Sequence, residues 1–448
     1  MGIEFLCDVF QQHASDEAVV WKDESYTYGW LLEQLDVWRN RLDEEQIEPG
    51  TVTMLEADFS PSAVALFLAL AERGCILVPL TEAVQGKRGE FIEIAEGEVT
   101  VQIDADDHAM IRRFDRKAEH PIYAELRLAG HPGLVLFSSG STGKSKAAVH
   151  DLEPLLDKFR VPRKKMRSIS FLLYDHIGGI NTMLYTLANA GCLVTVEKRS
   201  PDAVLKAIQQ HRVELLPTSP TFVNLILLSE AYKRWDLSTL TTVTYGTEPM
   251  PESTLKRFCE VVPHVRLLQT YGLSEVGILR SKSKSSDSLW VKIGGEGFET
   301  RIVDGLLEIK ARSAMLGYLN APSPFTEDGW FKTGDAVKQD GEYLLILGRK
   351  SEMINVGGEK VFPAEVESVI QQLDNVADVT VHGQKNPITG QIVCARVTLQ
   401  EHEEKKDFTR RLKAFCRELL APYKVPVKTT IVEDAQHSSR FKRMRQVD

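Results

Sequence analysis

The chain has 448 residues, of which 43% are hydrophobic and 26% are charged, a composition typical of a folded globular protein with room for two or three domains. Its net charge of −9 argues against a general nucleic-acid binder, which would carry a basic surface. From Arg349 onward, however, 17 Lys and Arg stand against 14 Asp and Glu. A basic segment on an acidic body suits a part that meets phosphate groups.

Neither the cysteines nor the apolar segments indicate an exported or membrane protein. The six cysteines are spread over the whole chain and form no C-x-x-C pair, which favours reduced thiols. The N-terminus has no basic region followed by a long apolar run, and the most apolar stretch, residues 62–71, is too short to cross a bilayer. We therefore predict a cytoplasmic protein without a membrane span.

The first half of the chain predicts a parallel sheet flanked by helices. Residues 52–55 and 75–80 have strand patterns, and residues 61–72 between them are apolar at helical spacing. A strand, a helix and a strand within about 30 residues predict a βαβ unit, whose strands are parallel. The α/β alternation continues with strands at 168–173, 193–196, 215–216 and 243–245 and helices at 204–211 and 221–228.

The second half changes character twice. After Gly305, short strands and turns replace the helices, with strand patterns at residues 306–309 and 343–347. From Arg349 onward the pattern is that of a small α+β unit whose first helix begins at Pro363, because proline favours the first helical position. We predict a large α/β domain with stacked sheets over residues 1–348 and a small α+β domain over residues 349–448.

A Ser/Gly-rich stretch, residues 137–146, follows the apolar run 134–137 and reads FSSGSTGKSK. Glycines permit positive φ angles, so that successive N–H groups and hydroxyls can point at one anion. The stretch is not a Walker loop, since Ser138 stands at the first glycine position and a strand, not a helix, follows at 146–150. It predicts a phosphate-binding loop between two strands, with a solvated turn as the alternative.

Further motifs follow this loop in a fixed order. They are YGLSE at 271–275, GYLN at 317–320, GWFKTGD at 329–335, GRKSEMI at 348–354 and PYKVP at 422–426. With the Ser/Gly loop they make the chain resemble, from about residue 26 to residue 445, the AMP-forming adenylate enzymes. That superfamily contains acyl- and aryl-CoA ligases, peptide-synthetase adenylation domains and luciferases. Several such motifs in order are far more specific than any one alone.

The resemblance implies the cofactors ATP and Mg²⁺, with Glu275 as the metal ligand, Tyr271 against adenine, and Asp335 and Arg349 at the ribose. The implied ATP- or AMP-binding residues are Ser138, Ser139, Gly140, Ser141, Thr142, Gly143, Lys146, Gly246, Thr247, Glu248, Thr270, Tyr271, Gly272, Ser274, Asp335 and Arg349. The implied catalytic residues are Lys442, Glu275, Thr142 and His176. Taken alone, Asp335 also suits a turn, Thr247 a plain loop and His176 a structural histidine.

Lys442 stands where the family has its terminal catalytic lysine. A point charge on a flexible stem suits a group that bridges two anions, here a carboxylate and the α-phosphate. The sequence departs from the family there, because Phe441 replaces the usual glycine and Arg440 the usual serine. Lys424, Arg443 and Arg445 are alternative cations, and a solvated basic tail is the alternative to a catalytic segment.

The family also implies an acyl pocket, a thiol tunnel and a hinge. The acyl pocket falls at His176, Ile177, Gly178, Phe222 and Tyr245. The thiol tunnel falls at Gly357 and Gly358, and the hinge of a mobile small domain falls at Ser351. The position that binds the ammonium group of an amino acid falls at Ile177, so we expect an acid without an amino group there.

The sequence thus predicts an ATP-dependent ligase that converts a small carboxylic acid into an acyl-adenylate and transfers the acyl group to a thiol. The thiol belongs to coenzyme A or to the phosphopantetheine arm of an acyl carrier protein, and the sequence leaves this choice and the oligomeric state open. The rival functions are a free-standing amino-acid adenylation domain and a non-catalytic ATP- or AMP-binding protein, which Phe441 and Ser351 would suit.

Overall fold

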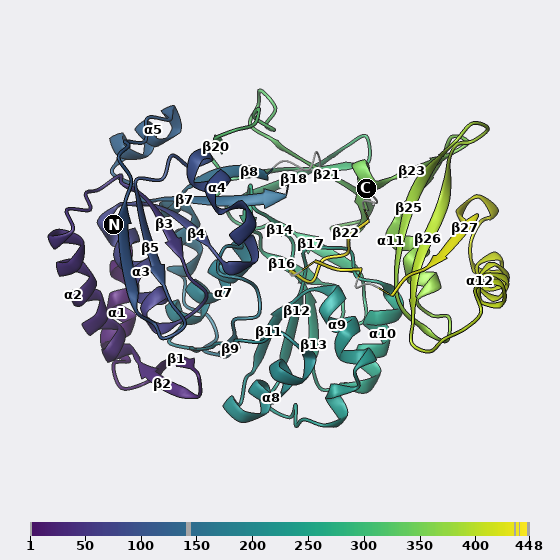
Figure 1. Ribbon diagram of the computed structural model, residues 1–448, viewed down its shortest axis with the longest axis horizontal. Coiled ribbons are helices and arrows are strands. Elements are labelled where there is room, and N and C mark those ends of the chain that lie inside the picture. Colours follow the sequence, from purple (N-terminus) through teal and green to yellow (C-terminus); the bar gives the residue numbers. More distant parts are fainter. Residues whose placement is uncertain (1, 140–144, 434–435, 439, 446–448) are drawn as a thin grey trace.

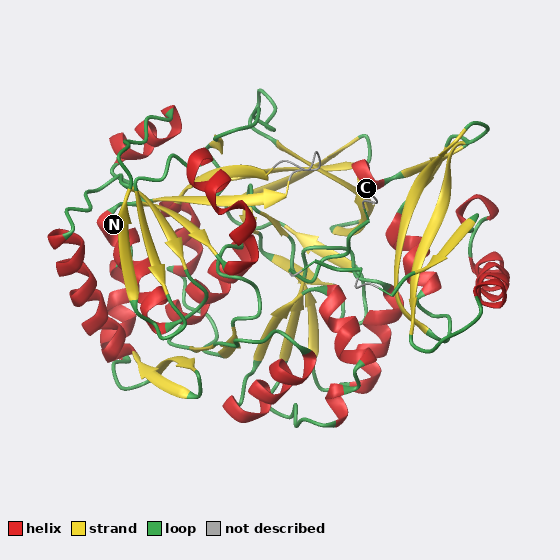
Figure 2. Ribbon diagram, in the orientation of Figure 1, coloured by secondary structure: helices red, strands yellow, loops and turns green. Residues whose placement is uncertain are grey.

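The structure is a computed structural model that describes residues 2–139, 145–433, 436–438 and 440–445 (Figure 1). In these residues, sheets flanked by helices form a large N-terminal part, and a smaller sheet with two helices lies beside it (Figure 2). The predicted α/β fold class is confirmed. No helix within the described ranges combines the length and the hydropathy needed to cross a bilayer.

Two seven-stranded sheets build most of the N-terminal part, and both are parallel except at their edges. The first sheet runs β13 (Arg266–Gln269), β12 (Thr242–Tyr245), β11 (Leu215–Thr218), β9 (Arg167–Ile169), β10 (Cys192–Val194), β1 (Glu17–Trp21) and β2 (Glu24–Thr27). The second runs β20 (Gly317–Tyr318), β8 (Ser145–Asp151), β7 (Gly133–Ser139), β4 (Ile76–Leu80), β3 (Val52–Glu56), β5 (Val99–Ile103) and β6 (Ala109–Arg113). The predicted βαβ unit is confirmed, since β3 and β4 pair in parallel.

An antiparallel sheet of six strands follows, and it carries most of the GWFKTGD motif and the start of the GRKSEMI motif. Its order is β16 (Ser281–Ser283), β17 (Trp290–Ile293), β22 (Tyr343–Arg349), β21 (Phe331–Asp340), β19 (Leu306–Ala311) and β18 (Phe298–Val303). A two-stranded ribbon of β14 (Gly272–Leu273) and β15 (Gly277–Ile278) precedes it in the chain. The YGLSE motif therefore lies on a short hairpin.

The C-terminal sheet contains β24 (Glu359–Val361), β23 (Ile354–Val356), β26 (Gly390–Leu399), β25 (Val376–Asn386) and β27 (Lys428–Ile431). Its strands pack against α11 (Pro363–Ile370) and α12 (Lys405–Leu419) around a hydrophobic cluster of their own. Sheet membership changes between β22 and β23, across the 3-10 helix η4 (Lys350–Glu352) that contains Ser351. A separate core is what an independent domain requires, and we keep the boundary near Gly348 as a proposal.

The remaining α-helices cover the sheets of the N-terminal part (Figure 1). They are α1 (Glu4–Gln12), α2 (Tyr28–Glu44), α3 (Pro61–Arg73), α4 (Arg88–Ile94), α5 (Pro121–Ala129), α6 (Leu152–Leu156), α7 (Ile177–Ala188), α8 (Pro201–His211), α9 (Pro220–Leu228) and α10 (Glu252–Val261). A Ser-Pro pair starts three of them, α3, α8 and α9. In each the serine hydroxyl accepts a backbone N–H and the proline occupies the first turn, so these starts are encoded locally.

The Ser/Gly stretch runs from strand to strand, as predicted. Strands β7 and β8 are antiparallel neighbours, and the register pairs Ser138 with Lys146 and Ser139 with Ser145. Four predicted loop residues, Gly140, Ser141, Thr142 and Gly143, lie outside the described residues. The described flanks agree with the exclusion of a Walker loop, because no helix begins at Ser145.

Candidate active site

Asp335 is a buried carboxylate that contacts Tyr271 and the half-exposed Arg349. It is on β21 and pairs across the sheet with Arg349, the last residue of β22. Arg349 Nε lies 2.9 Å from one carboxylate oxygen of Asp335, and the Tyr271 hydroxyl donates a hydrogen bond to the other. The residue is only 6% exposed, and burial raises the pKa of Asp335 although the Arg349 charge opposes that change. Each carboxylate oxygen keeps a further lone pair for a ligand hydroxyl.

Glu275 lies in the hairpin between β14 and β15 and meets the second strand of the Ser/Gly stretch through Tyr318. The Tyr318 hydroxyl donates to Glu275 Oε1 at 2.7 Å, and the Lys146 amine lies 5.2 Å from the centre of the Tyr318 ring. Strand pairing causes this meeting, because β20 places Tyr318 opposite Ala148 on β8. A carboxylate and a lysine, far apart in the chain, are thereby brought to one place.

His150 lies on the same strand, β8, and its side chain contacts the backbone of the YGLSE motif. Its Nε2 atom lies 2.5 Å from the carbonyl oxygen of Ser274, which can only accept, so Nε2 carries the proton. Burial lowers the pKa of His150, which keeps the ring neutral. This contact involves the Ser274 backbone, and it holds the residue next to Glu275 in place.

The loop after β12 carries two unusual backbone features. A Cβ on Gly246 would lie 2.8 Å from both the carbonyl and the hydroxyl oxygen of Thr270, so only glycine fits there. Thr247 has a φ of +74°, in the left-handed region that β-branched residues avoid. Such conformations cluster at functional sites.

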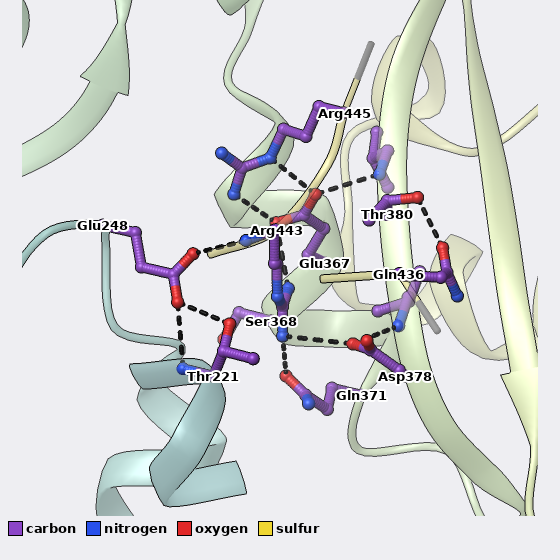
Figure 3. A network of polar contacts seen from close by, with 12 residues as sticks. Thr221, Glu248, Glu367, Ser368, Gln371, Asp378, Thr380, Gln436, Arg443 and Arg445 are labelled. Atoms are coloured by element: carbon purple, nitrogen blue, oxygen red, sulfur yellow. Dashed lines mark hydrogen bonds and ion pairs between the residues drawn. The ribbon is translucent and has the colours of Figure 1, made fainter. Parts of the chain in front are cut away.

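The C-terminal segment, residues 436–438 and 440–445, lies between the N-terminal part and the C-terminal domain (Figure 1). The backbone N–H of Arg443 donates to Glu248 Oε2 at 3.0 Å, and Glu248 Oε1 accepts from the N–H and hydroxyl of Thr221 at the start of α9 (Figure 3). Arg440 reaches further and lies 2.6 Å from Asp175, a carboxylate that is only 4% exposed. The segment is therefore attached to the N-terminal part at two places.

Glu367 on α11 attaches the same segment to the C-terminal domain (Figure 3). Its carboxylate accepts from Arg445 at 2.7 and 2.8 Å, from Arg443 at 3.0 Å and from the Val381 N–H at 2.9 Å. Burial alone would raise the pKa of Glu367, but the two arginines outweigh it and hold the pKa at about 2. Arg445 also lies 2.9 Å from Glu352, beside the predicted hinge Ser351.

Lys442 is held between these attachments, and its amine belongs to the wall of a small cavity of about 20 Å³. The cavity is lined by Phe171, Leu172, Leu173, His176, Arg199, Thr247, Arg440, Phe441 and Lys442. Burial and the Arg440 charge lower the pKa of Lys442 to about 8. The carboxylates of Glu248 and Glu275 act in the opposite direction, which shows that Lys442 lies within electrostatic range of the Glu275 hairpin.

His176 begins α7 and lines the same cavity. Its Nδ1 atom accepts the Gly178 N–H at 3.0 Å, so Nε2 is the protonated nitrogen. Burial lowers the pKa of His176, and the charges of Lys442 and Arg440 lower it further. The histidine is therefore a neutral donor beside two cations.

Two family models match this chain. Residues 8–304 match the AMP-binding enzyme, and residues 365–442 match the AMP-binding enzyme C-terminal domain. The chain belongs to the AMP-binding enzyme family. The resemblance inferred from the order of the motifs is confirmed.

Two curated members of the AMP-binding enzyme family illustrate how far the similarity extends. The indoleacetate–CoA ligase of Aromatoleum aromaticum is 28% identical over 392 residues, which covers 75% of this chain and 76% of the relative. A long-chain-fatty-acid–CoA ligase of Mycobacterium tuberculosis is 26% identical over 412 residues, with coverages of 82% and 81%.

Solved structures of the AMP-binding enzyme fold also match nearly the whole chain. An anthranilate CoA ligase in complex with anthranoyl-AMP has a TM-score of 0.82 at 19% identity, covering 98% of this chain and 95% of that one. The o-succinylbenzoate CoA synthetase of Bacillus subtilis, in complex with its acyl-adenylate intermediate, has a TM-score of 0.79 at 20% identity, with coverages of 98% and 96%. At these identities the likeness concerns the fold.

Six of the described residues predicted from the family motifs lie in two groups. Tyr271, Asp335 and Arg349 form one group, and Lys442, His176 and Thr247 line the cavity. Other predicted acyl-pocket residues, Ile177, Gly178, Phe222 and Tyr245, do not line the cavity. Phe222 and Tyr245 belong to the hydrophobic core behind it.

Gly357 and Gly358 lie in the turn between β23 and β24, away from this cavity. Both have positive φ, and a Cβ on either would meet nothing within 4 Å. Backbone conformation therefore explains these glycines here, whereas the close approach of a thiol arm stays a prediction. Gly358 lines an open cavity of about 800 Å³ together with Lys385 and neighbouring residues.

Four residues of the site were not among the residues predicted from the sequence. Tyr318 stands inside the GYLN motif, and Asn320 of that motif bonds the Ser145 carbonyl and the Ala147 N–H. The motif could therefore have indicated both. Glu367 and Phe171 could not be found in this way, because their roles depend on partners distant in the chain.

Proposed function

We propose that this AMP-binding enzyme is an ATP-dependent acid–thiol ligase. In the first step a carboxylate oxygen attacks the α-phosphorus of ATP, and the bond to pyrophosphate breaks to give an acyl-adenylate. In the second step a thiol sulfur attacks the acyl carbon, and AMP leaves. The observation that carries this proposal is the position of Lys442, which lines a cavity with His176 while lying within electrostatic range of Glu275 and Arg349.

Different residues would bind the different parts of the two anionic substrates, ATP and the carboxylic acid. Asp335 and Arg349 would hold the ribose, and Tyr271 would lie against adenine. Lys442 would neutralise charge between the carboxylate and the α-phosphate, since both reactants are anionic and catalysis here rests on alignment and charge. Ser138 and Lys146 would bind the departing phosphates together with residues 140–143.

Glu275 fits a magnesium ligand. Among the described residues, Tyr318 is the donor to Oε1 and Oε2 accepts no hydrogen bond. No group of three or more His, Cys, Asp or Glu side chains suited to a metal exists in the part of the chain that the structure describes. That agrees with Mg²⁺, which commonly takes one or two carboxylates and completes its shell with phosphate oxygens and water. When bound, the ion would supply positive charge to the phosphates.

Coenzyme A is the acceptor that we favour, because the similar curated relatives are named CoA ligases. The alternative is the phosphopantetheine arm of a carrier protein. The basic run KFRVPRKK at residues 158–165 could contact either CoA phosphates or an acidic carrier protein, since residues 160–165 are exposed. Lys158 itself points inward, because its amine bonds Asn181 and the Ile278 carbonyl and burial lowers its pKa to about 7. In the second step, a rotation at Ser351 would bring Gly357 and Gly358 to the thiol.

Two rival functions are less well supported. For an amino-acid substrate, the ammonium-binding position falls at the apolar Ile177, and the carboxylate of nearby Asp175 is already paired with Arg440 at 2.6 Å. For a non-catalytic nucleotide-binding protein, the terminal lysine would have no reason to reach the cavity, yet Lys442 lines it despite the unusual Phe441 before it. We therefore retain the ligase.

ATP–pyrophosphate exchange tests the first step directly. The wild-type protein should exchange label in the presence of at least one acid from a panel of short, long-chain, aryl and amino acids, and Lys442→Ala should lower the rate at least about 100-fold. Thioester formation with coenzyme A, measured separately, tests the second step. Absence of exchange with every acid, or unchanged exchange in Lys442→Ala, would contradict the proposal.

A further inference from the structure

The C-terminal segment contributes the end wall of the acid cavity. The Phe441 ring lies 5.2 Å, centre to centre, from both Phe171 and Phe222, which are themselves 4.2 Å apart. Phe171 and Phe222 come from the N-terminal part, whereas Phe441 directly precedes Lys442. One short segment thus supplies both the cation and an aromatic wall.

The backbone of Phe441 is held in a conformation that disfavours a bulky residue. Its φ is +52°, in the left-handed region where glycine is at ease, and the family usually has glycine at this position. Hydrogen bonds from Phe441 N to Ser438 O and from Ser438 N to Lys442 O, both 2.9 Å, fix the turn. Aromatic packing with two rings offsets the cost of that conformation. Strain of this kind at a site indicates a specific use of the side chain.

With the Phe441 ring in place, little room remains for an acyl chain. The cavity of about 20 Å³ has space for roughly one water-sized group. Phe171, Leu172, Leu173 and Phe441 form the apolar part of its wall, and polar or charged residues form the rest. A long or aromatic acid would have to displace Phe441.

Of the three cationic side chains that line the cavity, only Lys442 has no carboxylate partner among the described residues. Arg199 is paired with Asp58 through two contacts of 2.9 Å, and Arg440 is paired with Asp175 at 2.6 Å. Among the described residues, no carboxylate lies within ion-pair distance of Lys442. A single uncompensated cation matches a single carboxylate, not a dicarboxylic acid.

We propose that Phe441 determines acid specificity and restricts this enzyme to the shortest aliphatic monocarboxylic acids, with one or two carbons beyond the carboxyl group. The inference rests on the proposed ligase function and names its substrate class. The ring acts as a fixed stop at the end of the pocket. Removing it opens the space beside Phe171 and Phe222 and admits longer acids.

Phe441→Ala and Phe441→Gly test the proposal in pyrophosphate exchange with acetate, propionate, hexanoate, decanoate and benzoate. Wild type should favour acetate and propionate over hexanoate. Because each methylene in an apolar pocket changes kcat/KM by roughly 10- to 200-fold, both variants should raise kcat/KM for hexanoate at least about 10-fold. A wild type that uses hexanoate or benzoate as well as acetate overturns the inference and leaves the ligase intact.

Two comparisons separate pocket size from other effects. Alanine keeps the strained turn and glycine relieves it, so a gain seen only with Phe441→Gly would place the effect in the backbone and overturn the inference. Phe415→Ala removes a half-buried ring from the C-terminal core and should leave the acid preference unchanged. If no variant and no acid gives exchange, the proposed function itself fails, which is a different outcome from a broad wild-type preference.

Discussion

The Nε and Nη2 atoms of Arg445 lie 2.8 and 2.7 Å from the two carboxylate oxygens of Glu367, a bidentate pair buried at the base of the C-terminal segment. Arg443 joins the same carboxylate at 3.0 Å. Lys442 directly precedes Arg443, so Glu367 fixes where the segment leaves the C-terminal domain. Glu367 is a positioning residue that acts on the reaction through Lys442.

Glu367→Gln should lower kcat of pyrophosphate exchange roughly 10- to 100-fold with little change in KM for the acid. The physical reason is that a displacement of Lys442 by about 1 Å can lower the rate by up to roughly 100-fold. Glu365→Gln is the matched control, because Glu365 lies on the same helix but forms an exposed ion pair with Lys424. A loss of equal size in both variants would contradict a positioning role.

The same carboxylate should make folding sensitive to acid. The pKa of Glu367 is about 2 in the folded protein against an ordinary 4.5, so its stabilising contribution is complete above about pH 4.5 and lost as the pH falls toward 2. That difference corresponds to about 3 kcal/mol at neutral pH. Urea unfolding of wild type and Glu367→Gln, followed by circular dichroism, should give free energies that differ most at pH 7, differ less as the pH falls below about 4.5, and converge only near pH 2. A pH-independent gap would refute this account.

The charge on Lys442 should control activity at alkaline pH. Its pKa is lowered to about 8, so the amine is charged below that pH and neutral above it. The kcat/KM for ATP, which reports on the free enzyme, should fall as the pH rises through about 8. Arginine stays charged over this range, so Lys442→Arg should be slower at neutral pH and should lose the alkaline decline. Identical alkaline limbs in both proteins would exclude Lys442 as the titrating group.

Asp335→Asn should raise KM for ATP by about 10- to 100-fold, because hydrogen bonds to a charged group are worth about 1.5–3 kcal/mol. Tyr271→Phe removes one donor to that carboxylate and should have a smaller effect, of a few-fold. Titration of both variants with ATP by calorimetry would separate binding from turnover. Asp340→Asn, an exposed change on the same strand, should bind ATP like the wild type.

Local features were readable from the sequence. Helix starts such as Ser60-Pro61 depend on contacts between residues a few positions apart, so they are encoded where they occur. The strand-to-strand Ser/Gly loop followed from Ser138 and from the apolar residues after Lys146, and the order of the motifs identified the family. These signals are short in range, which is why one sequence sufficed.

The active-site interior was decided by tertiary structure. Arg440 and Asp175 are 265 positions apart, and neither the pairing nor the occupation of Asp175 follows from local pattern. Phe441 was visible in the sequence only as a departure from glycine, whereas its packing against Phe171 and Phe222 depends on how the C-terminal segment docks. Docking is set by the partly buried Glu248 and the buried Glu367, whose contribution to the free energy comes from desolvation and pairing with residues distant in the chain. The motifs therefore identify the family. The size of the acid pocket is set only when the C-terminal segment docks on the N-terminal part.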